Sequence, residues 1–229
     1  MRVFGASLVF FIAMSCCAQQ APRSFELRTH RMDVDVDGAP RAYGPPGFAT
    51  LDVLRDAHRG GRLDGEVVGY LLDKHGHAVV QGPNDPAPGF YVSQTTFEDE
   101  RYAERDPRRY VDATRINYVV LGDVARRRGA RIGDLVAVHS QRTGRCVFGV
   151  VADSGNPSGD EGSLHLMQEL GYPFHDGRQE SIEEPDVTVR FYPHSNPHGV
   201  FFREQGTLNN FARAQGLRCD FSGAPASKQ

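Results

Sequence analysis

The chain has 229 residues, of which 39% are hydrophobic, and this size fits one domain with a full core while leaving little room for two. Its formal net charge of -3 and sequence pI near 6.3 provide no basic surplus, so the composition argues against a nucleic-acid-binding protein. A cationic partner is easier to accommodate than an anionic one.

The N-terminus has the layout of a secretory signal peptide. A positive charge precedes the apolar run Val3–Met14, and small residues follow, with Cys16 and Ala18 at the −3 and −1 positions of a cleavage site. We therefore expect a secreted protein with a signal peptide over residues 1–18 and a flexible leader over residues 19–31. A lipid anchor on Cys16, in a periplasmic or cell-surface protein, is the alternative.

The rest of the chain is expected to form one domain over residues 32–221, followed by a frayed tail over residues 222–229. Removal of the leader leaves two cysteines, Cys146 and Cys219, and in a secreted chain such a pair predicts a disulfide. Two unpaired buried thiols are the alternative. A bridge would be structural rather than redox-active, because the sequence contains no CxxC motif.

An acidic segment opens the domain. The run from Met32 to Gly38 alternates aspartates with apolar residues, so as a strand it presents Asp33, Asp35 and Asp37 on one face. This face suits a groove for a cationic substrate, with a solvated edge strand as the alternative. The run also fits the opening of a calcium loop, but Gly44 stands where such a loop needs its closing acid.

The following segments predict short strands separated by turns, with few helices. Apolar or alternating runs predict strands at 67–72, 78–81, 90–97, within 108–121, and at 135–139, 146–152 and 186–192, whereas capping and periodicity predict helices at 50–57, 123–129 and 207–215. The strands do not alternate regularly with helices, which argues against a parallel doubly wound sheet. We expect a mainly β fold, a barrel with short helical insertions.

The stretch from Gly149 to Leu170 carries the strongest indication of chemistry. Asp153 lies at the end of an apolar strand, where a glycine-rich loop begins, and Glu161 follows eight residues later. Ser163, two residues after Glu161, is the expected N-cap of a helix that ends at Gly171. Such a loop can set two carboxyl groups across a groove. Glycoside hydrolysis needs this pair, one group to protonate the leaving oxygen and one to activate water or to attack. A solvated turn is the alternative, because these are ordinary loop residues.

Other catalytic motifs are absent from the sequence, which contains no G-x-S-x-G elbow, HExxH, P-loop or dinucleotide-binding fingerprint. His194 and His198 have a spacing that zinc sites use, but the sequence offers no third ligand nearby, so we expect them to be polar loop residues. We predict no metal and no cofactor.

Several blocks, taken in order, resemble the glycoside hydrolase family 75 chitosanases, which are secreted, endo-acting enzymes. The family's MD-x-D-x-DG block is similar to MDVDVDG at 32–38, its PG-x-YVS-x-T segment to residues 79–97, one of its strands to YVDATRINYVVL at 110–121, and its DSG to EGS block to residues 149–166. The resemblance covers roughly residues 32–192, and the last block is the most specific.

The resemblance implies a six-stranded double-psi β-barrel, with Asp153 and Glu161 as the catalytic pair. The chain departs from the family in carrying Asp160 where Gly is common, Val36 where Cys is common and Tyr118 where Pro is common. These departures bear on fine specificity more than on the type of reaction.

We predict an inverting endo-chitosanase in which Glu161 is the acid and Asp153 the base, with carboxyl groups about 6.5–9.5 Å apart. Asp35, Asp37 and Asp160 would pair with the ammonium groups of glucosamine units. Two alternatives remain: a peptidoglycan or chitin endo-hydrolase with the same carboxylates, and a non-catalytic polysaccharide-binding barrel. We expect a monomer that binds an amino-sugar polymer, with no nucleic-acid partner and, unless it is lipid-anchored, no membrane partner.

Overall fold

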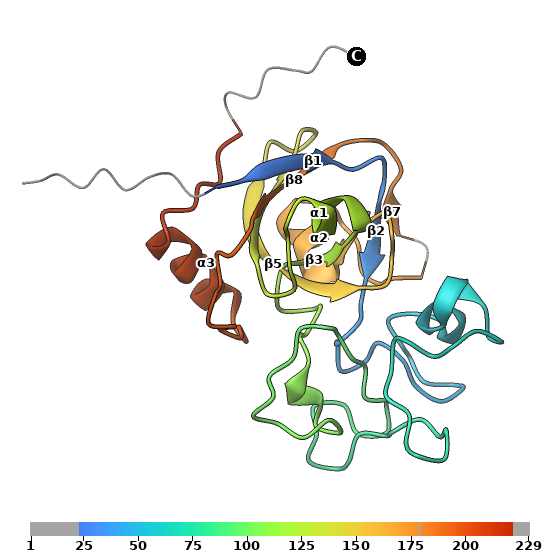
Figure 1. Ribbon diagram of the computed structural model, residues 1–229. Coiled ribbons are helices and arrows are strands. Elements are labelled where there is room, and N and C mark those ends of the chain that lie inside the picture. The colour runs from blue at the N-terminus through green and yellow to red at the C-terminus, as the bar shows by residue number, and fades with distance from the viewer. Residues whose placement is uncertain (1–22, 179, 222–229) are drawn as a thin grey trace, which may run out of the picture.

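One curled sheet of eight strands forms the centre of the protein, whose computed structural model describes residues 23–178 and 180–221 (Figure 1). The strands are β1 (Phe25–Arg28), β2 (Met32–Asp35), β3 (Tyr118–Leu121), β4 (Leu135–Ser140), β5 (Cys146–Ser154), β6 (Glu161–Ser163), β7 (Ser181–Ile182) and β8 (Val187–Tyr192). Their spatial order is β1-β8-β4-β5-β3-β6-β2-β7. The pairs β2 with β6 and β3 with β5 are parallel, and the others are antiparallel. The predicted mainly β fold is confirmed at this level. The predicted signal peptide and frayed tail lie outside the described residues.

Apolar, β-branched sequences build the middle of the sheet. β3 is buried along its whole length, as are residues 135–138 of β4 and 148–153 of β5. Continuous apolar runs of this kind suit strands that are covered on both faces. β3, β4, β5 and β8 lie where the sequence predicts strands, and β4 and β5 form the predicted hairpin.

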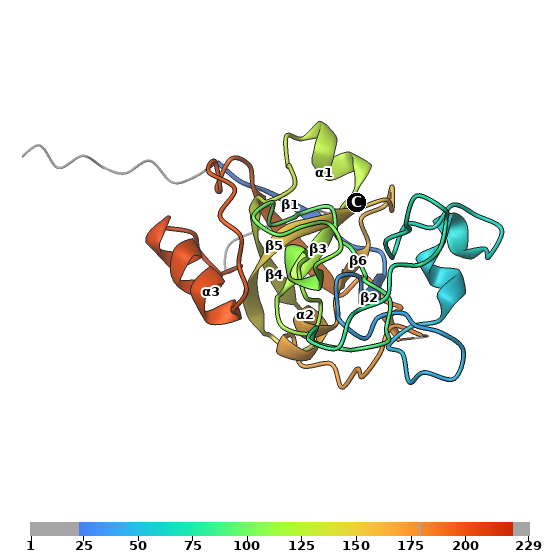
Figure 2. The same cartoon turned by 90° about the horizontal axis from the view of Figure 1, so that it is seen from below.

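In the part of the chain that the structure describes, three short α-helices accompany the sheet: α1 (Asp123–Arg127), α2 (Leu164–Glu169) and α3 (Gln205–Ala214). α1 and α2 lie at opposite ends of the curled sheet, and α3 packs on the outside of β5 (Figure 2). α2 begins as predicted, because the Ser163 hydroxyl accepts the Leu166 N–H at 3.1 Å, and Gly171 (φ 97°) follows its last turn. Within the two described ranges, no helix has both the length and the apolar character needed to cross a bilayer.

The connection between β2 and β3 contains little regular structure. It holds the 3₁₀ helices η1 (Leu54–Ala57), η2 (Arg59–Gly61) and η3 (Pro107–Arg109), together with isolated β-bridges. The prediction of full strands at 67–72, 78–81 and 90–97 is therefore wrong, although the bridge between Leu72 and Ala78 retains the expected hairpin. Glycine and proline recur every few residues in this segment, so the pairing breaks after single residues.

The helix predicted at 50–57 is also shorter than expected. Only η1 forms, and its N-cap is Val53. Thr50, the predicted cap, instead donates its hydroxyl to the Asp52 carbonyl at 2.7 Å. This local hydrogen bond stabilises a turn in competition with the helix.

The domain begins earlier than the sequence predicts, because residues 25–28, assigned to a flexible leader, form β1 and pair with β8. The Phe25 ring stacks on Phe191 with centroids 5.2 Å apart, and Arg190 binds Glu26 at 2.6 Å. Four residues are too few to show a clear alternation. The strand is defined by a partner 164 residues away in the chain, which the sequence pattern does not reveal.

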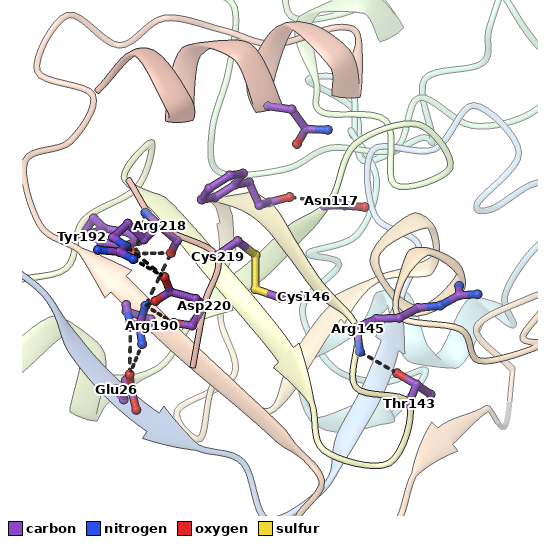
Figure 3. The surroundings of a disulfide bond; sticks show 12 residues. Glu26, Asn117, Thr143, Arg145, Cys146, Arg190, Tyr192, Arg218, Cys219 and Asp220 are labelled. Carbon is purple, nitrogen blue, oxygen red and sulfur yellow. Dashed lines mark hydrogen bonds and ion pairs between the residues drawn. A yellow bond between two sulfur atoms is a disulfide. The ribbon is translucent and has the colours of Figure 1, made fainter. Parts of the chain in front are cut away.

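A disulfide joins Cys146, at the start of β5, to Cys219 in the segment after α3, and the predicted pairing is confirmed (Figure 3). The same C-terminal segment is hydrogen-bonded to the sheet, because the Tyr192 hydroxyl of β8 donates to the Arg218 carbonyl at 2.6 Å. Covalent and polar contacts therefore hold the end of the domain against two central strands.

Candidate active site

Asp153 and Glu161 lie on two strands that flank β3. Asp153, near the end of β5, pairs with Val120 of β3, while Glu161 begins β6, whose next residue, Gly162, pairs with Val119. Because β6 runs antiparallel to β3, Glu161 falls beside Val120 on the side opposite to Asp153. Two strand spacings therefore separate the backbones of the two acids, about 9.5 Å.

The glycine-rich loop that links the two acids lies against the end of β3. The Asp123 N–H donates to the Pro157 carbonyl at 2.8 Å. Gly122 is so close to the loop that a Cβ atom there would lie 2.5 Å from the Ser158 carbonyl oxygen. Gly159 adopts φ 72°, which favours glycine. The two glycines allow the chain to turn back tightly from β5 into β6.

Asp153 is buried, with 8% of its surface exposed, and its Oδ1 atom accepts three hydrogen bonds. The donors are the Thr96 N–H (3.1 Å), the Thr96 hydroxyl (2.8 Å) and the Ser154 N–H (2.7 Å). Burial and, after it, the charge of Asp35 raise the pKa of Asp153 to about 7, and the three donors oppose that rise. Asp153 therefore exchanges its proton near neutral pH.

Glu161 is partly buried, and burial followed by the charge of Asp35 raises its pKa to about 8. The charges of Asp33 and Asp153 add to the rise, and a hydrogen bond with the Asn156 side chain opposes it. Each of the two predicted catalytic acids therefore responds to the same neighbour, Asp35. Simultaneous ionisation of these groups is unfavourable near neutral pH, so they titrate as a coupled set.

Asp35, Asp37 and Asp153 form an acid triad in which one oxygen from each carboxylate lies within 4.8 Å of the others. The Asp37 N–H donates to Asp35 Oδ1 at 2.8 Å, and the Tyr118 hydroxyl donates to the Asp37 carbonyl at 3.0 Å. Asp37 Oδ1 is buried and has no hydrogen-bond partner among the described residues. Burial raises the pKa of Asp35, and burial together with the charges of Asp35 and Asp153 raises that of Asp37 well above its usual value.

The triad has carboxylate oxygens at a spacing that a hard divalent cation could bridge. The raised pKa values indicate protons shared within the triad. At neutral pH the negative charge of the triad can therefore be compensated in two ways, by protons shared among the carboxyl groups or by a bound cationic group.

Two of the predicted acids, Asp33 and Asp160, lie outside the cluster formed by the triad and Glu161. Asp33 binds Arg31 at 2.5 Å near the surface. Burial raises the pKa of Asp160, and its other neighbours are His30, Arg31 and Asp33. Asp160 therefore lies on the Arg31 side of β2, and its predicted contact with substrate remains a prediction.

The structure brings four predicted site residues, Asp35, Asp37, Asp153 and Glu161, into one cluster. Sequence reasoning assigned no role to Thr96, although this residue belongs to a block that carries the family resemblance. It likewise treated Tyr118 only as a departure from the family's proline, whereas its hydroxyl binds the backbone of Asp37. The sequence places Thr96 57 residues from Asp153, so only the fold reveals their contact.

The raised carboxyl pKa values predict that the folded protein loses stability as the pH increases. The folded state holds protons that the unfolded chain releases near pH 4, so the contribution of these groups is complete below about pH 4. It is lost as the pH rises through the folded values, about 7 for Asp153 and about 8 for Glu161.

Asp37→Asn tests this effect. The substitution removes a carboxyl group that must take up a proton, or be buried as an anion, when the chain folds at high pH. We therefore expect it to increase the free energy of unfolding at pH 8 by about 1–3 kcal/mol. At pH 4 the gain should be much smaller, because the unfolded chain then keeps about half of the proton that the folded state holds on Asp37. Urea unfolding of both proteins at pH 4, 6 and 8 measures the difference. A gain that does not grow with pH would contradict the assignment of a raised pKa to Asp37.

The chain was also compared with known proteins. It matches no protein-family model and no curated protein sequence.

Proposed function

We propose that this protein is an inverting, endo-acting glycoside hydrolase whose substrate is chitosan. One observation carries the proposal: Asp153 and Glu161, with pKa values of about 7 and about 8, lie on either side of β3. A general acid must hold its proton near the working pH, and a general base must be able to lose its own. The backbones of the two acids lie two strand spacings apart, about 9.5 Å, and this spacing allows their carboxyl groups to flank one glycosidic bond. The inverting mechanism is proposed from the resemblance to the chitosanase family, in which the carboxyl groups lie far enough apart to admit a water.

In this proposal Glu161 is the acid and Asp153 the base. The three donors on Asp153 Oδ1 stabilise its ionised form, so Asp153 is the first of the pair to give up a proton. No described residue donates to Asp153 Oδ2, which is free to accept a proton from water. Glu161 has the higher pKa and delivers its proton to the glycosidic oxygen.

The acid triad supports an amino-sugar substrate. An ammonium group beside the partly exposed Asp35 and Asp37 would compensate charges that burial makes unfavourable. It would also weaken the repulsion that raises the pKa of Asp153, so that substrate binding itself helps to ionise the base. Asp160, outside the triad, would meet the polymer further along the chain.

Replacing both Asp35 and Asp37 by asparagine tests this part of the proposal. We expect kcat/KM on chitosan at low salt to fall roughly tenfold, because a charge-assisted contact contributes about 1.5 kcal/mol. The activity of the variant should also depend less on salt than that of the wild type. Reducing-end assays between 20 and 500 mM salt measure both effects. Over this range the Debye length, the distance over which salt screens charges, falls from about 20 Å to about 4 Å. Unchanged turnover at low salt would contradict the role of the triad.

We also propose that the curled sheet is a variant of the six-stranded double-psi barrel and that the protein acts outside the cytoplasm. The two parallel pairs, β2 with β6 and β3 with β5, support the first proposal. The disulfide supports the second, because such bonds persist mainly in oxidising compartments.

A reducing-end assay on soluble chitosan tests the activity directly, with chitin and peptidoglycan as parallel substrates. Release of reducing ends from chitosan alone supports the proposal, whereas release only from chitin or peptidoglycan would assign the carboxylates to a different polymer. Binding without release from any substrate would indicate a polysaccharide-binding barrel. Proton NMR of the first products gives the anomeric configuration, and retention would contradict the inverting mechanism.

A further inference from the structure

An open pocket of about 850 Å³ lies beside the acid cluster, between residues 96–101 and residues 198–201. Its volume falls within the range of small-molecule sites, roughly 300–1,000 Å³. One of its lining residues, Thr96, is also the residue that holds Asp153 through its N–H and its hydroxyl. A polymer with its scissile bond at Asp153 would therefore place a neighbouring sugar unit at this pocket.

The two walls of the pocket are fixed to each other. The carboxylate of Asp99, which is 4% exposed, binds Arg101 of its own wall at 2.7 Å and Arg203, just beyond the other wall, at 2.5 Å. The rings of Phe97 and Phe201 meet between the walls with centroids 5.4 Å apart. The pocket is thus formed before any ligand binds, which lowers the entropic cost of binding.

Three carboxylates line the pocket, and two of them are already compensated. Asp99 is held by its arginines, and Glu98 binds Arg109 at 2.5 Å. Glu100 is exposed and forms no ion pair or side-chain hydrogen bond with the described residues.

Arg101 also lines the pocket, and because Asp99 binds both Arg101 and Arg203, this group keeps one positive charge. Glu100 is therefore a local negative charge at the rim rather than a net negative charge of the pocket. The Phe201 ring contacts Phe97 and lies under Arg203, which leaves its edge toward the pocket.

We propose that this pocket is a subsite for one ammonium-bearing glucosamine unit, with Glu100 as its charge partner. The inference rests on the proposed function, because the position of the subsite is defined by the bond cleaved at Asp153. The Glu100 carboxylate pairs with the ammonium group, and the edge of the Phe201 ring packs on the apolar face of the sugar. An N-acetylated unit carries no charge at this position and gains nothing from Glu100.

Binding of a fully deacetylated glucosamine hexasaccharide tests the subsite without requiring turnover. Calorimetry compares three proteins: Glu161→Gln, and the same protein with either Glu100→Gln or Glu104→Gln added. Glu104 is the matched control, an exposed acid on the same segment that does not line the pocket. At low salt we expect Glu100→Gln to weaken binding about two- to fivefold, the size of one exposed ion pair. Glu104→Gln should leave it unchanged.

Binding is also measured with the fully acetylated hexasaccharide, and with the deacetylated one at 0.5 M salt. Under both conditions Glu100→Gln should no longer weaken binding. Equal weakening by Glu100→Gln and Glu104→Gln would overturn the subsite, as would no weakening or no binding at all. Hydrolysis of chitosan by the wild type is measured in parallel. If the wild type hydrolyses chitosan but Glu100→Gln does not weaken binding, the subsite is wrong and the proposed function stands. If Glu100→Gln weakens binding but the wild type does not hydrolyse chitosan, the proposed function is wrong and the pocket remains a glucosamine-binding site.

Discussion

Asp153→Asn and Glu161→Gln should each remove nearly all chitosan hydrolysis while leaving folding and polymer binding largely intact. Each substitution keeps the size of the side chain and most of its hydrogen bonds but prevents proton transfer. The loss therefore falls on the transition state and appears in kcat rather than KM. General acid–base catalysis contributes roughly 10²–10⁴-fold per group, so either variant should lose at least that factor.

Asp160→Asn is the matched control for this pair, because Asp160 precedes Glu161 in the chain yet has its neighbours on the Arg31 side of β2. We expect it to retain most of the wild-type kcat. Initial rates from the reducing-end assay, with circular dichroism to verify folding, compare the three variants. If Asp160→Asn silenced the enzyme and Glu161→Gln did not, the acid would be Asp160, and the assignment of Glu161 would be wrong.

Strands and helices with strong local signals could be predicted from the sequence. β5 is apolar for most of its length and contains three valines, and α2 has a serine cap at its start and a glycine after its end. Both signals arise from residues that are close together in the sequence, so they do not depend on contacts with distant parts of the chain. In contrast, β1 depends on a partner far along the chain, and the segment between β2 and β3 is broken by glycine and proline into single bridges.

The candidate site shows the same division. Asp153 and Glu161 could be singled out because a strand, a glycine-rich loop and a helix cap surround them in the sequence. The charge of Asp35 on both acids depends on the parallel pairing of β2 with β6, which no local pattern specifies. Burial in the folded protein raises the pKa of both acids, followed by the charge of Asp35, and for Asp153 the contact with Thr96 across the fold opposes the rise. The chemistry is therefore suggested by local sequence and adjusted by tertiary contacts.

The disulfide is expected to be the largest single contribution to stability outside the core. Cys146 and Cys219 are 73 residues apart, and closing a loop of that length in the unfolded chain corresponds to about 4 kcal/mol in the entropy model. The double variant Cys146→Ser/Cys219→Ser should therefore lose about that much free energy of unfolding. Urea unfolding of the variant and the oxidised wild type at pH 6 measures it.

Two controls separate the covalent bond from the packing around it. Reduced wild-type protein should unfold at the same urea concentration as the double variant, because both lack only the bond. Tyr192→Phe removes the hydroxyl that binds the Arg218 carbonyl and leaves the disulfide in place, so we expect it to cost only about 1 kcal/mol. A loss below 1 kcal/mol in the double variant would contradict the entropy argument. The contacts of Phe221 with His139 and Arg190 are expected in the folded protein with or without the bond, so they should not compensate for its effect on the unfolded chain.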